Sequence, residues 1–206
     1  MKIQPIGAAL CLLLTACFTS EASNDTTSKT INKERNVMTK SEEIKPHFTP
    51  KQFLLKMLEM MTVSNSTADF TRERMEKVFG VQLKPTKDGG LIFSEKVSKK
   101  WTQEFEKYKV PMSESYSFSL AFHPTEDTPE IVERGELCEM TYEEFIGRAV
   151  MAGFIATPIY HAGTTVITNV HFKKNDLNIN VGFSREYKRT KERPNPRLCI
   201  DLITIR

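Results

Sequence analysis

Tyr116-Ser117-Phe118-Ser119-Leu120-Ala121-Phe122 is the stretch of this 206-residue chain that decides the fold. Large apolar side chains alternate in it with small, mostly polar ones. Because successive side chains of a strand point to opposite faces, the stretch predicts a strand with one buried face. Such strands are typical of an antiparallel sheet that is covered on one side and open to solvent on the other.

The same alternation occurs on both sides of that stretch. The other segments that fit strands are residues 91–97, 101–108, 166–172, 177–183 and 198–205. Residues 101–108 also fit a helix, but we favour a strand because no helix cap precedes them. The turn Lys173-Lys174-Asn175-Asp176 joins two of the downstream segments as a hairpin.

Three helix starts share one arrangement, in which an apolar residue precedes a threonine and a second apolar residue follows it. We expect the threonine to cap the helix and the apolar pair to pack together. The starts are Phe48-Thr49-Pro50-Lys51-Gln52-Phe53, Phe70-Thr71-Arg72-Glu73-Arg74-Met75 and Met140-Thr141-Tyr142-Glu143-Glu144-Phe145. The first helix is expected to run to about Thr62, the second to stop at Gly80, and the third to include Phe154 and stop before Pro158. Glu144 at the third start predicts a full capping box.

A helix followed by a three-stranded meander therefore occurs twice, over residues 71–122 and 141–205. This order predicts an α+β fold, with an antiparallel sheet of about six strands and the helices packed on one face. We expect residues 47–206 to form a single domain. The order is similar to that of small outer-membrane assembly lipoproteins, which place two helices on a three-stranded sheet.

The N-terminal stretch has the composition of an export signal. Lys2 precedes an apolar run at residues 6–14, which is too short to span a membrane. The run ends in Leu14-Thr15-Ala16-Cys17, which resembles the lipobox of bacterial lipoproteins. The resemblance implies that residues 1–16 are a signal peptide and that Cys17 carries the lipid. The alternative is an ordinary secretory signal cut after Ala22.

Residues 17–46 are mostly polar, and they predict a flexible tether between the lipid and the domain. Phe18 follows the lipobox cysteine at the position where enteric lipoproteins of the inner membrane carry aspartate. The resemblance therefore implies a protein that is anchored in the outer membrane through Cys17 and faces the periplasm.

Cys138 and Cys199 are the two cysteines that remain after the leader and the lipid site. Two cysteines in an exported chain favour a disulfide, because that compartment is oxidising. The alternative is a pair of buried free thiols.

A catalytic site is a further possibility for Cys138, with His161 or His171 as its base. Papain-like peptidoglycan endopeptidases are similar in placing a cysteine before a histidine. Their Asp-Cys-Ser-Gly motif is missing here, where the sequence reads Glu136-Leu137-Cys138-Glu139-Met140. The histidines show no metal-ligand spacing, so neither a metal nor a cofactor is expected.

Two blocks of like charge lie between the predicted strands. Residues 124–139 are rich in acids, whereas residues 184–197 are basic. Both blocks fit solvated loops, but clustered charge also steers partners, and we interpret the basic block as a contact surface. Its expected contact residues are Arg185, Tyr187, Lys188, Arg189, Lys191 and Arg193. The net charge of +3 is too small to indicate a nucleic-acid partner.

These observations predict a non-enzymatic, periplasm-facing lipoprotein of the outer membrane that binds an unidentified envelope or toxin protein. An inhibitor or immunity-type protein and an envelope assembly factor both fit this class. The alternative function is a cell-envelope hydrolase that uses Cys138 and a histidine.

Overall fold

The computed structural model describes residues 44–125, 135–185 and 197–206, which lie within one compact unit, Glu42–Arg206. The helices of this part of the chain are α1 (Pro50–Thr62), α2 (Arg72–Phe79) and α3 (Tyr142–Met151), with short 3-10 helices η1 (Thr67–Asp69) and η2 (Gly135–Leu137). The strands are β1 (Lys84–Pro85), β2 (Leu91–Lys96), β3 (Trp101–Lys109), β4 (Tyr116–Pro124), β5 (Ile155–Tyr160), β6 (Ile167–Lys174), β7 (Leu177–Arg185) and β8 (Leu198–Ile205).

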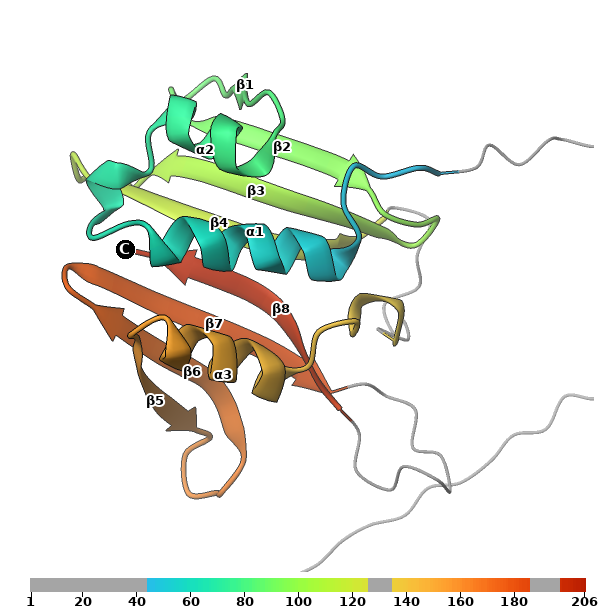
Figure 1. The fold of residues 1–206 in the computed structure, drawn as a ribbon, viewed down its shortest axis with the longest axis vertical. Coiled ribbons are helices and arrows are strands. Elements are labelled where there is room, and N and C mark those ends of the chain that lie inside the picture. Colours follow the sequence, from blue (N-terminus) through green and yellow to red (C-terminus); the bar gives the residue numbers. More distant parts are fainter. Residues whose placement is uncertain (1–43, 126–134, 186–196) are drawn as a thin grey trace, which may run out of the picture. The chain divides into compact units, whose positions relative to one another are not determined.

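The strands form one antiparallel sheet in the order β1-β2-β3-β4-β8-β7-β6-β5 (Figure 1). Each half is a meander of four strands that follows a helix, with α2 before β1–β4 and α3 before β5–β8. The halves meet where β4 pairs with β8, and Leu120 lies opposite Ile203 there. The α+β class, the antiparallel sheet and the strand at residues 101–108 are confirmed.

The predicted count of six strands is wrong, because the described residues contain eight. The additional strands are β1, which has two residues, and β5, which begins at Ile155. The third helix ends at Met151 and does not include Phe154, because Gly153 turns the chain with φ 89°. The strand that follows contains Pro158, which β5 tolerates as an edge strand with one unpaired side.

Threonine caps all three α-helices, as the sequence predicts. The hydroxyl of Thr49 accepts from the backbone N–H of Gln52, Thr71 accepts from Arg74, and Thr141 accepts from Glu144. The first start also forms the reciprocal capping box, since the side chain of Gln52 accepts from the N–H of Thr49 at 2.9 Å. The full box predicted for the third start does not form. The carboxylate of Glu144 instead contacts two cations, which are described below.

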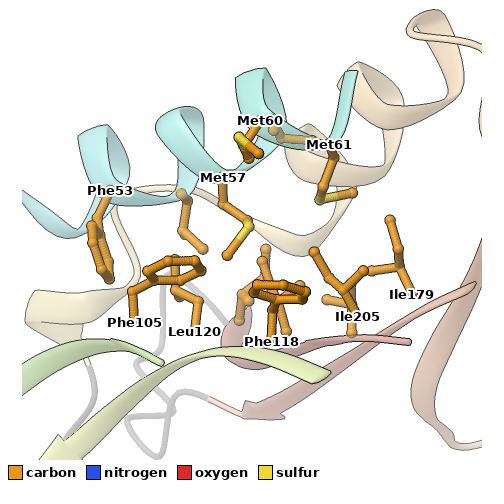
Figure 2. Close-up of a cluster of buried hydrophobic side chains, with 14 of the residues drawn as sticks. Phe53, Met57, Met60, Met61, Phe105, Phe118, Leu120, Ile179 and Ile205 are labelled. Carbon is orange, nitrogen blue, oxygen red and sulfur yellow. The ribbon is translucent and has the colours of Figure 1, made fainter. Parts of the chain in front are cut away.

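The core lies between the helices and one face of the sheet (Figures 1 and 2). α1 carries Phe53 and three buried methionines, and it lies over the line where the two halves meet. Side chains from β3, β4, β7 and β8 pack beneath it, among them Phe105, Phe118, Leu120, Ile179 and Ile205. The three methionines of α1 are therefore core residues.

Candidate functional site

Cys138 and Cys199 form the disulfide that was expected between them. Their Sγ atoms are 2.00 Å apart and their Cα atoms 5.0 Å apart. Both residues are buried, with exposures of 3% and 0%. Cys138 follows η2, Cys199 is the second residue of β8, and a backbone bridge pairs Cys199 with Thr141. The disulfide thus fixes the start of α3 to the start of β8.

This disulfide also lies where the two charged blocks attach to the domain. β4 ends at Pro124, β7 ends at Arg185, and Arg185 is paired with Leu198 at the start of β8. Since β4 runs antiparallel to β8, its end lies beside that same start. The described residues that flank segments 126–134 and 186–196 therefore gather at one end of the sheet, around the disulfide.

Most of the predicted contact residues lie outside the described ranges. They are Tyr187, Lys188, Arg189, Lys191 and Arg193, while the backbone of Arg185 ends β7. The predicted lipidation site Cys17, the signal peptide at residues 1–16 and residues 17–43 of the predicted tether also lie outside.

The structure does not assemble the catalytic group considered for Cys138. The disulfide leaves Cys138 without a free thiol, which a cysteine nucleophile requires. His161 is exposed in the turn after β5, where its backbone N–H donates to the carbonyl oxygen of Val166 at 2.8 Å. His171 lies on β6 between Val170 and Phe172, which are both buried, so its side chain is on the opposite, open face of the sheet.

That open face carries a polar hollow of about 350 Å³ around His171. It is lined by Ile159, Asn169, His171, Asn178, Asn180, Thr204 and Arg206. His171, Asn178, Asn180 and Thr204 each lie between two buried residues of their strand, and this period of two is the sequence signal that could have identified them. The Oδ1 atom of Asn180 is buried and has no hydrogen-bond partner among the described residues. The amides, hydroxyl, imidazole and guanidinium of the hollow can bind polar groups.

Two side chains of β3, in the other half of the sheet, have shifted pKa values. Burial raises the pKa of Glu106, and the like charges of Glu104 and Asp88 act in the same direction. Burial lowers the pKa of Lys107, whose ammonium group donates to the carbonyl oxygen of Phe70 at 3.3 Å and lies 4.7 Å from the ring centroid of Tyr116. Glu106 and Lys107 point to opposite faces of the sheet as neighbours in one strand, so they form no acid–base pair.

No group of three or more His, Cys, Asp or Glu side chains among the described residues is placed to hold a metal ion. No helix in the ranges that the structure describes is long and apolar enough to cross a membrane.

No family model, curated protein or solved structure matches the chain.

Proposed function

We propose that this chain is a lipid-anchored protein of the outer membrane that faces the periplasm, binds another protein and catalyses no reaction. The lipobox-like Leu14-Thr15-Ala16-Cys17 supports the anchor, and Phe18 supports sorting to the outer membrane. Acyl chains attached at Cys17 would hold the protein at the bilayer, since each buried CH₂ contributes about 0.8 kcal/mol.

The single observation that carries the proposal is the disulfide between Cys138 and Cys199. Structural disulfides persist in oxidising compartments such as the periplasm, so the bridge supports export. It also supports a binding protein over the alternative hydrolase, because it occupies the thiol that the hydrolase would need.

The basic block at residues 184–197 is the proposed contact surface. Its described flank, Arg185, pairs with β8 next to the disulfide, and loops held by a rigid scaffold are frequent binding surfaces. Clustered cations steer an acidic partner and raise its association rate. The partner is therefore an envelope or toxin protein with an acidic surface. An inhibitor of such a protein and an assembly factor would both use the block in this way.

Site-specific photocrosslinking tests this proposal. We would replace Tyr187 with benzoylphenylalanine in cells and irradiate them, using the same replacement at exposed Lys77 of α2 as the control. The proposal predicts a covalent adduct with one envelope or toxin protein from position 187 and not from position 77. No adduct at position 187, or the same adducts at both positions, would reject the contact surface.

A further inference from the structure

Strand β2 has an edge that its neighbour covers only in part. β1 has two residues, and it pairs Lys84 with Ile92 and Pro85 with Leu91. β2 continues to Lys96 and pairs with β3 along its whole length. The outer edge of β2 beyond Ile92 therefore lies next to no described strand (Figure 1).

The hydrogen-bond register identifies the backbone groups that this edge presents. Just beyond the strand, the N–H of Val97 donates to the carbonyl oxygen of Trp101, so alternate residues before it, Glu95 and Phe93, bond to β3. Ser94 and Lys96 consequently direct their N–H and C=O groups away from β3, and both residues are exposed. An added antiparallel strand would find its donors and acceptors two residues apart, as in any such ladder.

A groove of about 560 Å³ follows this edge. It is lined by residues 45–47, which precede α1, by residues 80–82 and Lys84, which follow α2, and by residues 92–96 of β2. The groove can therefore hold side chains of a strand whose backbone pairs with Ser94 and Lys96.

Charge at the groove favours an acidic occupant. Lys84 and Lys96 line it and are exposed, and neither has an ion-pair partner in the described ranges. Glu95 is the one acid among the described lining residues, and its two oxygens already accept hydrogen bonds. Its Oε2 accepts from the backbone N–H of His47 at 2.8 Å, and its Oε1 accepts from Nε2 of Gln103 at 2.6 Å.

We propose that the β2 edge binds an extended, acidic segment of a partner protein as an additional antiparallel strand. In this mode of recognition the main chain supplies the affinity and pockets for alternate side chains supply the specificity. The lysines repel a second copy of the same edge, which favours a partner of opposite charge over self-association. The site goes beyond the proposed function, because β3 and β4 separate it from β8 and it requires neither the lipid nor the basic block.

A displayed library of nine-residue peptides, selected on the purified protein, tests this inference. We expect the selected peptides to alternate apolar with polar residues and to be enriched in Asp and Glu. A fluorescent selected peptide should bind the wild type and Ser94→Ala with the same Kd, within about twofold, because this substitution keeps the backbone donor. Ser94→Pro removes the outward N–H at an edge position that tolerates proline, and it should weaken binding about tenfold or more.

Two further measurements keep the test decisive if Ser94→Pro does not fold. Lys84→Glu with Lys96→Glu should weaken the peptide about tenfold, while the matched Lys84→Gln with Lys96→Gln should weaken it less. Every second backbone N–H of the bound peptide would face β2, and the others would face away from it. Methylation of the nitrogens that face β2 should abolish binding, whereas methylation of the other set should spare it. Selected peptides without acidic enrichment, or equal binding to Ser94→Pro and Ser94→Ala, would overturn the inference, as would a selection that enriches no peptide.

Discussion

The ammonium group of Lys51 lies 3.1 Å from the carboxylate of Glu144 and joins α1 to α3. Arg148, one turn further along α3, also lies 3.1 Å from that carboxylate. The hydrogen bond from Lys51 is the largest cause that lowers the pKa of Glu144; burial opposes it, and Arg148 assists. The ion pair therefore connects a helix over the centre of the sheet to the helix that begins the second half.

Glu144→Gln should make the domain less stable at neutral pH and leave its stability unchanged in acid. A folded-state pKa below the unfolded value contributes stability that is present above the unfolded pKa and is lost as the pH falls through the folded one. For a partly exposed pair we expect a melting temperature about 1–4 °C lower at pH 7. Thermal unfolding at pH 7 and pH 2.5 measures this, with exposed Glu143→Gln as the control. If the melting temperatures of wild type and Glu144→Gln differ by the same amount at both pH values, the ionised Glu144 carboxylate does not stabilise the fold.

Removal of the disulfide should destabilise the domain strongly. The bridge closes a separation of 61 residues, for which chain entropy gives about 4 kcal/mol. The double variant Cys138→Ser, Cys199→Ser should melt about 8–16 °C below the oxidised wild type. A reductant should lower the melting temperature of the wild type and leave that of the double variant unchanged. Thiols would also be counted in the denatured protein without reductant. Two reactive thiols in addition to any at Cys17 would refute the disulfide.

The two faces of β4 should respond differently to truncation. Phe118 is fully buried, and its ring centroid lies 4.5 Å from that of Phe70, whereas neighbouring Ser119 lies half-buried on the open face. Phe118→Ala should destabilise by about 3–5 kcal/mol and Ser119→Ala by less than about 0.5 kcal/mol. Urea titration compares the two. Similar unfolding midpoints would mean that the register of β4 is wrong.

Cys17→Ser should abolish incorporation of an alkyne fatty acid and release the protein from the membrane fraction. Cys11→Ser, in the same leader, is the matched control and should leave labelling intact. Mass spectrometry of the N-terminal peptide should find acyl chains on Cys17 in the wild type. If membrane association persists without lipid mass, the anchor is not at this cysteine.

The segments in which apolar and polar residues alternate were correctly predicted as strands. This pattern is local, because successive side chains of a strand point to opposite faces and only one face of this sheet is covered by helices (Figure 1). Residues 155–160 were missed since Phe154 continues the helical spacing of α3 and Pro158 argues against a strand. The left-handed turn at Gly153 ends the helical spacing before Phe154, which is buried, whereas Val150 on the helix is exposed. β1 was missed because it is too short to show a period.

The candidate sites could be predicted from the sequence only in part. Cys138 and Cys199 could be paired because they were the two cysteines left to consider. The polar hollow could not be assembled from the sequence, because it is lined by side chains of β5 to β8, and β5 was not among the predicted strands. The groove at β2 depends on β1 ending early, a length that no local pattern indicates.

Charge reversal in the basic block tests the central claim most directly. Arg189→Glu, Lys191→Glu and Arg193→Glu would be combined, and the control would combine the same change at exposed Lys77, Lys87 and Lys173. Capture of the protein crosslinked at position 187 would be measured from low to high salt. We predict a loss of about tenfold or more at low salt for the basic-block variant, a smaller loss at high salt, and capture within about twofold for the control. Capture by the basic-block variant that equals the wild type at every ionic strength would contradict the account.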